Sequence, residues 1–433
     1  MDYEIRTKIN SIRKGKVPVG YKKTNVGIIP CDWKVIKFEQ VAEITSSKRI
    51  MAEEYVKEGI PFFRSKEIIE KSLNSHIEES LYISFERYKE ISDKFPVPQK
   101  DDILITAVGT LGVPYVIKEE DLPFYFKDGN LLWMREINTI LSLYLYFQWN
   151  SPIVTRQIER IFNGSSQKAL TIEKVNKLIF PLPNKQEQER ITSILFTSDK
   201  VIELKEKIIR QKKQQKKWLR QNLLTGRVKI PGYNAQWKEI KLREIFDRVT
   251  RKNSEGNTKV LTISAQQGLI SQGDFFNKVI ASESLDNYCI LKKGEFAFNK
   301  SYSNGYPMGA IKRLTLYDRG VVTSLYICFK LREDKDCSPE FFEQYFEAGL
   351  LNRGLTKVAN EGGRAHGLLN ITPSDFFNLK VKVPNAEEQK AIADILVEAD
   401  KEIQILEKEL DLLKQQKKGL IQLLLTGKVR VKC

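Results

Sequence analysis

The chain contains a repeat whose two copies lie 201 residues apart. The segment PNKQEQ at 183–188 returns as PNAEEQ at 384–389, and the match continues without a gap to the Leu-Thr-Gly at 224–226 and 425–427. About half of the aligned positions are identical. This period is too long for a solenoid, whose units repeat every 20–50 residues or so. We therefore expect two copies of one complete module, an arrangement that suits a roughly two-fold symmetric partner such as a DNA duplex.

Each copy of the module begins well before its proline. The segment DWKVIKF at 32–38 returns as QWKEIKL at 236–242, so each copy starts at a tryptophan. Between tryptophan and proline, short apolar runs at 102–108 and 294–300 indicate buried strands, and aromatic segments at 144–147 and 341–346 indicate helices. We therefore predict two mixed α/β modules of about 150 residues each, which is an ordinary domain size. The predicted boundaries are an N-terminal extension at 1–30, globular domains at 31–184 and 231–385, and long-helix regions at 185–230 and 386–433.

The segments after the two prolines are predicted to be long helices. Proline is absent from both segments, Gln188–Leu224 and Gln389–Leu425. Each is followed directly by Thr-Gly, which is a signal for a helix C-terminus. Their shared apolar residues follow the i, i+3, i+4, i+7 spacing of one stripe. A helix of about 55 Å cannot bury such a stripe on a small domain alone, so we expect the two helices to pair, although each could instead pack only on its own module. The expected interface residues are Ile191, Ile194, Leu195, Ile202, Ile209, Leu219, Ile392, Ile395, Leu396, Ile403, Leu410 and Leu420.

The overall charge indicates a polyanionic partner. With 71 Lys and Arg against 55 Asp and Glu, the chain carries a net charge of +16, which favours nucleic acid or an acidic membrane surface. Membrane attachment has little support, because no stretch approaches 18 apolar residues and the N-terminus MDYEIRTKIN is charged. The five cysteines form no CxxC pair and are interpreted as reduced thiols. We therefore expect a cytoplasmic protein that has no contact with a membrane.

The basic excess is concentrated in the first long-helix region. Residues 185–230 contain 13 basic and 5 acidic side chains, whereas residues 386–431 contain 8 and 9. This excess could contact DNA phosphates, contact an acidic subunit, or form an ordinary solvated helix face. The residues concerned are Lys212, Lys213, Lys216, Lys217, Arg220, Arg227 and Lys229.

Sequence motifs for catalysis are missing from the chain. It lacks the GxxxxGK[ST] phosphate loop, the HExxH zinc helix, the GxSxG nucleophile elbow and the NPPY or DPPY motif of amino-methyltransferases. Only two histidines, His76 and His366, are available for acid–base or metal chemistry. The carboxylates at 119–121 lie in a polar segment that is expected to be a solvated loop. We therefore predict a binding protein without catalytic residues, a metal site or a cofactor of its own.

A set of motifs together resembles one known family. The segments GYK at 20–22 and GIIPCDW at 27–33, the prolines followed by Glu-Gln, and the doubled Leu-Leu-Thr-Gly are similar to the specificity (S) subunits of type I restriction–modification enzymes. The resemblance covers nearly the whole chain, and its specificity lies in the combination rather than in any single motif.

The resemblance implies both a fold and a function. The fold would be mixed α+β, with two similar target recognition domains separated by an antiparallel coiled coil of two long helices in a pseudo-two-fold repeat. Each domain would read one half of a split double-stranded DNA sequence, and the full target would be asymmetric. Two methyltransferase (M) subunits would supply S-adenosylmethionine and catalysis, and nuclease–translocase (R) subunits would use ATP and Mg²⁺. The specificity subunit itself would perform no reaction.

Candidate DNA-contacting residues are the polar and basic side chains beside glycine-containing turns. Arginine suits guanine and glutamine or asparagine suits adenine in the major groove, although each of these residues could simply be a solvated loop side chain. The candidates in the first module are Arg64, Ser65, Lys66, Thr106, Thr110, Lys127, Ser166, Gln167 and Lys168. Those in the second module are Gln266, Gln267, Lys300, Ser301, Tyr302, Asn304, Arg364 and His366.

Two other functional classes remain open at the level of sequence. The chain could be a non-catalytic coiled-coil scaffold that binds acidic proteins without reading DNA sequence. It could also be a nuclease or methyltransferase with an unfamiliar site, which the missing motifs disfavour.

Overall fold

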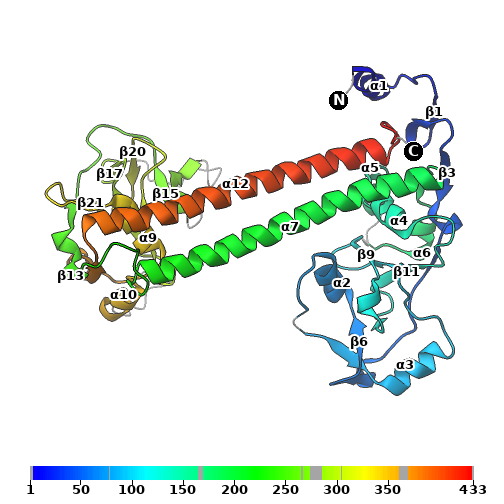
Figure 1. The fold of residues 1–433 in the computed structure, drawn as a ribbon, viewed down its shortest axis with the longest axis horizontal. Helices are drawn as coiled ribbons and strands as arrows, with labels where there is room; N and C mark the ends of the chain where they lie inside the picture. The colour runs from blue at the N-terminus through cyan, green and yellow to red at the C-terminus, as the bar shows by residue number, and fades with distance from the viewer. Residues whose placement is uncertain are drawn as a thin grey trace. The chain divides into compact units, whose positions relative to one another are not determined.

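The computed structural model describes residues 3–77, 79–163, 169–264, 267–273, 285–303, 305–359 and 369–431. The chain divides into two compact units. The first comprises residues 1–205 and 409–433, and the second comprises residues 206–408. Each unit therefore combines one globular module with parts of both long helices (Figure 1).

The first module is built on two small sheets. One has the order β4-β11-β8-β9 with antiparallel neighbours, and the other has the order β10-β6-β7-β5 with a parallel β10-β6 pair. The run Ile-Leu-Ile-Thr of β8 is buried at every position. Such β-branched and apolar residues favour a strand inside a sheet, and β8 lies between β11 and β9. The strands are β4 (Glu43–Thr45), β5 (Tyr55–Val56), β6 (Ile60–Phe63), β7 (Leu81–Ile83), β8 (Ile103–Thr106), β9 (Pro114–Val116), β10 (Tyr125–Phe126) and β11 (Leu131–Arg135).

Helices and a return strand complete the first module. Thr171 caps α6 (Ile172–Asn176) by accepting a hydrogen bond from the backbone of Lys174. Strand β3 (Lys34–Lys37) pairs with β12 (Ile179–Leu182), which joins the start of the module to its end. The other elements are α1 (Tyr3–Arg13), β1 (Tyr21–Thr24), β2 (Gly27–Pro30), α2 (Ser65–Ser72), α3 (Phe85–Ser92), α4 (Ser142–Trp149), α5 (Pro152–Asn163) and α6 (Ile172–Asn176).

The second module repeats this framework with different sequences. Its central sheet has the order β14-β21-β18-β19, and β13 pairs with β22 as β3 does with β12. Thr372 caps α11 in the same way that Thr171 caps α6. The elements are β13 (Lys238–Lys241), β14 (Phe246–Val249), β15 (Leu261–Ser264), β16 (Gly268–Ser271), β17 (Cys289–Lys292), β18 (Phe296–Asn299), β19 (Ala310–Arg313), β20 (Arg319–Val322), β21 (Ile327–Leu331), α9 (Pro339–Glu347), α10 (Asn352–Val358), α11 (Pro373–Phe377) and β22 (Lys380–Val383).

The long helices are α7 (Lys185–Leu223) and α12 (Ala386–Leu424), each of 39 residues. Each is one uninterrupted helix (Figure 1). Gly226 and Gly427 follow their C-termini with φ of 66° and 67°, as the Thr-Gly signal predicts. A Cβ at Gly427 would lie 2.4 Å from Cδ of Pro30, so the close approach of this turn to the first module also requires glycine.

The two long helices pair in antiparallel fashion within each unit. In the first unit, Asp199 pairs with Lys417, and Lys205 lies 2.8 Å from Glu409. In the second unit, ion pairs join Lys212 to Glu402 at 2.6 Å, Lys213 to Glu407 at 2.6 Å, and Lys216 to Asp400. Residue numbers on α12 fall as those on α7 rise, which establishes the direction. The predicted helix pairing and the mixed α/β modules are confirmed.

Most of the expected interface residues are buried or half-buried. Ile191 and Leu195 lie in the first unit's core with Leu424, the last residue of α12, and Leu425 after it. Ile392 and Leu396 lie in the second unit's core with Leu223, the last residue of α7, and Leu224 after it. Ile209 and Ile403 are buried, and Ile202, Leu219, Leu410 and Leu420 are half-buried.

Two members of the expected interface depart from the expectation. Ile194 and Ile395 each remain 38% exposed. Successive helix residues point about 100° apart, so a face centred on 191 and 195 leaves residue 194 at its edge. These two isoleucines border the seam instead of filling it.

No helix in the described part of the chain is both long enough and apolar enough to cross a membrane.

Candidate nucleic-acid interface

In the first unit, several strand ends meet at one edge of the module. Strands β6 and β10 are parallel, so the residues after them, Arg64 and Lys127, leave the sheet at the same edge. The backbone N–H of Lys127 donates to the carbonyl of Phe63 at 2.9 Å. Ser65 Oγ and the N–H of Ala107 both donate to the carbonyl of Asn130, at 3.2 and 2.8 Å. The segments 64–66, 107–112 and 127–130 therefore form one group, here called the first loop cluster.

A further segment, at 46–49, joins the first loop cluster and was missed in the sequence. Ser47 Oγ donates to the carbonyl of Phe126 at 2.7 Å, and Arg49 Nε donates to Asp128 Oδ2 at 2.9 Å. The side chain of Arg49 is 74% exposed, so most of this cation faces solvent. The run Ser-Ser-Lys-Arg directly after strand β4 was the available signal.

The guanidinium of Arg64 forms an ion pair with a neighbouring carboxylate inside the module. Its Nη2 lies 2.5 Å from Oε1 of Glu67, which is fully buried, and its backbone N–H also donates to Glu67 at 2.7 Å. Burial alone would raise the pKa of Glu67, but the hydrogen bonds from Arg64 outweigh it and lower that pKa. A base would therefore compete with Glu67 for this guanidinium. Lys66 is exposed and lies 3.8 Å from Glu70.

Thr106 is removed from the candidate set by its burial. It is 0% exposed; its hydroxyl donates to the carbonyl of Thr110 at 2.5 Å and accepts from the N–H of Val113 at 2.9 Å. The hydroxyl thus closes the 107–112 loop and cannot reach a base. Trp149 Nε1 holds the far side of the loop through the carbonyl of Gly112 at 2.8 Å. Thr110 is exposed at the end of this loop and stays a candidate.

In the second unit, the equivalent loop follows β18 and is described at 300–303 and 305–309; these residues are here called the second loop. Lys300 Nζ donates to the carbonyl of Ile371 at 3.3 Å, and burial lowers the pKa of this lysine. The N–H of Ser301 donates to Asn299 Oδ1 at 3.0 Å. Tyr302 is 64% exposed. Tyr302 is therefore better placed than Lys300 or Ser301 to touch a ligand.

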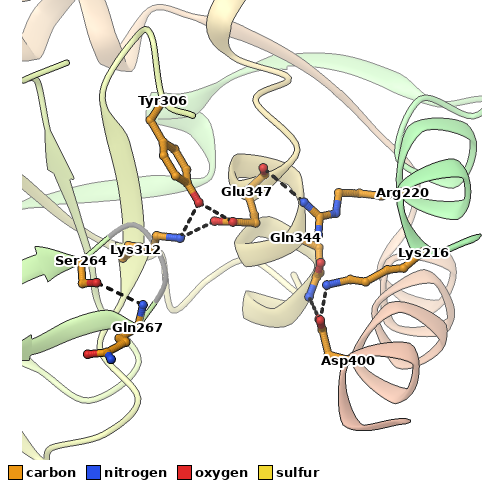
Figure 2. A network of polar contacts seen from close by, with 9 residues as sticks. All are labelled: Lys216, Arg220, Ser264, Gln267, Tyr306, Lys312, Gln344, Glu347 and Asp400. Atoms are coloured by element: carbon orange, nitrogen blue, oxygen red, sulfur yellow. Dashed lines mark hydrogen bonds and ion pairs between the residues drawn. The ribbon is translucent and has the colours of Figure 1, made fainter. Parts of the chain in front are cut away.

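Gln267 is exposed in the turn between β15 and β16. Its backbone N–H donates to Ser264 Oγ at 3.3 Å, as Figure 2 shows, so this bond does not involve the side-chain amide. Seven further candidates lie outside the described residues: Ser166, Gln167, Lys168, Gln266, Asn304, Arg364 and His366.

The basic residues of α7 have partners that the sequence did not suggest. Lys212, Lys213 and Lys216 pair with carboxylates of α12 within the second unit, and Arg220 Nη1 donates to the carbonyl of Glu347 at 3.4 Å. Much of the basic excess therefore joins the two helices, a role that none of the three alternatives contained. Lys229 Nζ donates to the carbonyls of Asn234 and Ala235 at 3.4 and 3.2 Å.

Among the described residues, no group of three or more His, Cys, Asp or Glu side chains could hold a metal ion. What the loops offer instead is exposed cations, hydroxyls and the exposed ring of Tyr302 at strand ends. Such groups can donate to phosphates and base edges, so the arrangement suits binding to nucleic acid.

Comparison with known proteins shows a consistent family likeness. The family model described as the type I restriction modification DNA specificity domain matches twice, at residues 30–214 and 234–415. The putative type I restriction enzyme MjaX specificity subunit of Methanocaldococcus jannaschii is 26% identical over 448 residues, with 95% of this chain and 97% of that protein covered. The MjaVIII specificity subunit of the same organism is 25% identical over 439 residues, covering 93% and 94%.

The fold is also similar to that of a solved structure. The crystal structure of a type I restriction–modification S subunit from M. genitalium superposes with a TM-score of 0.54, at 16% identity, over 93% of this chain and 98% of that one.

Proposed function

The chain belongs to the type I restriction–modification DNA specificity family, and from this premise we propose that it reads a bipartite, asymmetric DNA target. The observation that carries the proposal is the doubled module with unlike loops. Both copies retain the framework from tryptophan to long helix, whereas the segments at the strand ends differ in length and in residue type. Two readers of different shape would recognise two different half-sites.

We further propose that the paired helices set the number of unread base pairs between the half-sites. Each helix of 39 residues is about 58 Å long at about 1.5 Å per residue. The cross-helix ion pairs hold the register of the pair in each unit. Linking two readers also means that binding of one half-site delivers the other reader to the DNA.

In this proposal the chain carries no catalytic residue and acts as a scaffold. Two methyltransferase subunits would bring S-adenosylmethionine, and nuclease–translocase subunits would bring ATP and Mg²⁺ chemistry. The chain's own residues would bind DNA, fix the register of the target and hold these subunits around it.

The direct test is co-expression with the cognate methyltransferase subunit in a host without other modification, followed by sequencing of methylated bases. We expect one split motif with unlike halves. Replacing residues 31–184 by the matching module of a relative should change one half only and so assign each half to a module. A complex that binds an acidic protein but shows no methylated motif and no preference among DNA sequences would favour the scaffold alternative.

Helix length provides a second test. The ion-pair register places Lys207 about opposite Lys408, its own counterpart in the repeat. Inserting four residues after each of these lysines adds about 6 Å, or roughly two base pairs, to the pair. The gap should lengthen while both half-sites stay the same. An unchanged gap would refute the proposed role of the helices.

A further inference from the structure

The second loop is tied to helix α9 by three polar side chains. Tyr306 OH donates to Glu347 Oε1 at 2.5 Å, and Lys312 Nζ lies 2.5 Å from Glu347 Oε2. Lys312 Nζ also donates to Tyr306 OH at 3.0 Å, which closes a triangle (Figure 2). Each carboxylate oxygen of Glu347 therefore has its own donor, and the three groups fix one another's positions.

The triangle acts on the stem of the loop. Ser303 and Tyr306 exchange backbone hydrogen bonds of 3.3 and 2.8 Å, so holding Tyr306 also holds the residues beside it. Gly309 ends the loop at a φ of 79°, and a Cβ there would lie 2.3 Å from the carbonyl oxygen of Asn299. Exposed Tyr302 lies next to this fixed stem.

Helix α9 is itself attached to both long helices of the second unit. Gln344 Nε2 donates to Asp400 Oδ2 of α12 at 3.0 Å, and the same aspartate pairs with Lys216 of α7. Arg220 of α7 donates to the carbonyl of Glu347 at 3.4 Å. A continuous set of polar contacts therefore runs from the paired helices through α9 to the second loop, as Figure 2 shows.

The first module holds its corresponding loop differently. There the Thr106 hydroxyl closes the loop on itself. By strand register, Tyr115 of β9 stands where β19 has Lys312, and its hydroxyl donates to Asp121 Oδ2 at 2.7 Å instead of to a residue of a helix. The first module thus pairs Tyr115 with Asp121, which also binds Lys71, whereas the second module's carboxylate, Glu347, belongs to α9. Apolar side chains between the loop and α9 would give similar stability. A hydrogen-bonded network differs in that its donors and acceptors favour one defined geometry.

We infer that Tyr306, Lys312 and Glu347 are positioning residues for DNA reading by the second module, and that Tyr302 is the side chain they present. This inference rests on the proposed function. Discrimination between bases requires a contact to be held within a fraction of an ångström, so loss of the Tyr306 hydroxyl lets the loop accept several positions. Wrong bases are then tolerated in one half-site.

The test uses the full chain in complex with its methyltransferase subunits. Tyr306→Phe removes the hydroxyl and keeps the ring. We expect methylation of DNA with single mismatches in the second module's half-site to rise about tenfold relative to the correct sequence. Discrimination in the other half-site should not change. Glu347→Gln keeps an acceptor for the Tyr306 hydroxyl and should give a smaller loss of discrimination in the second module's half-site.

Two matched variants separate positioning from stability. Tyr345→Phe removes a hydroxyl from a buried residue of the same helix outside the triangle, and should leave both half-sites as in the wild type. Thr106→Val opens the first module's loop and should relax only the first half-site. If Tyr306→Phe and Glu347→Gln leave discrimination intact, or relax both halves equally, the inference is overturned. A wild-type complex without a split motif would instead refute the proposed function.

Discussion

The two modules are attached to their long helices by the same contact and surround it with different residues. Trp33 Nε1 donates to Glu187 at 3.0 Å in the first module, and Trp237 Nε1 donates to Glu388 at 3.2 Å in the second. In the first unit Arg430 also binds Glu187, whereas the equivalent Lys229 of the second unit donates to the backbone carbonyls of Asn234 and Ala235. The duplication has therefore preserved the buried joint between module and helix and has allowed the charges around it to diverge.

This difference shows which parts of a duplicated fold can change. The joint buries an indole, a carboxylate and a helix N-terminus together, so a substitution there leaves a buried polar group without a partner. Loops and half-exposed charges lose much less when they change, since water can replace the missing partner. We therefore expect equivalent core substitutions to cost similar free energies and equivalent charge substitutions to cost different ones.

The largest expected effect is a pair of equal losses in the core. Leu195 and Leu396 are equivalent residues, both 0% exposed. Replacing either by alanine should lower the free energy of unfolding by about 2–5 kcal/mol, through lost burial and the cavity left behind. Denaturant unfolding of the two variants measures this. Costs that differ by more than about 2 kcal/mol would mean that the two joints are not equivalent.

A smaller and unequal effect is expected at Arg430. Its Nη2 lies 2.8 Å from Asp32 and 2.8 Å from the fully buried Glu187. Arg430→Met leaves Glu187 buried without its cation, and we expect the free energy of unfolding to fall by about 2 kcal/mol. A larger loss is not expected, because the side chain of Arg430 is 42% exposed. The control Lys229→Met should cost less than about 0.5 kcal/mol. Equal thermal stabilities of the two variants would contradict the asymmetry.

Asp102 and Glu295 occupy equivalent positions before the central strand and provide a pH test. Burial raises the pKa of Asp102 from 3.8 to about 6, against hydrogen bonds from Gln99 and Trp133 that lower it. The folded state then binds more protons than the unfolded state between about pH 4 and 6, so this carboxyl makes the protein less stable as pH rises through that window.

Asp102→Asn should therefore be more stable than the wild type by about 2 kcal/mol at pH 7, and the difference should vanish near pH 4. Glu295 has an ion pair with Arg251, so Glu295→Gln should instead cost about 1 kcal/mol at pH 7. Unfolding midpoints measured from pH 4 to 8 distinguish the stabilising Asp102→Asn change from the destabilising Glu295→Gln change. A Glu295→Gln variant that gains stability at neutral pH would show that the ion pair does not compensate for burial.

Local sequence patterns predicted the helices and modules well. The 3.6-residue spacing and the glycines after α7 and α12 depend on neighbouring residues, and the period of 201 residues is found by comparing two segments of the sequence directly. Contacts between distant residues could not be predicted in this way. Nothing near Glu187 distinguishes it from other glutamates; its partner Trp33 is 154 positions away.

The site was predicted less well for the same reason. Thr106 is polar and lies near a glycine, as a base-contacting residue would, but its hydroxyl is used by the loop's own backbone. Tyr306 was missed because its role depends on Glu347, 41 residues later. For the lysines of α7 the sequence left contact with DNA, contact with an acidic subunit and a solvated face open, yet several face acidic residues about 200 positions away.

The smallest expected effect tests whether the cross-helix charges are equivalent. Lys216–Asp400 and Lys417–Asp199 are the same pair in the two units, and the lysine side chains are 12% and 23% exposed. Because both pairs retain contact with solvent, we expect each Lys→Met change to lower the free energy of unfolding by less than about 1 kcal/mol.

Asp400 also accepts a hydrogen bond from Gln344, so the carboxylate keeps this side-chain donor when Lys216 is replaced. Burial lowers the pKa of Lys216, which further reduces what its charge contributes. Lys216→Met should therefore cost no more than Lys417→Met, and high salt should narrow both differences from the wild type. A larger loss at Lys216 that resists salt would show that the network from the helices to α9 stabilises the second unit as a whole.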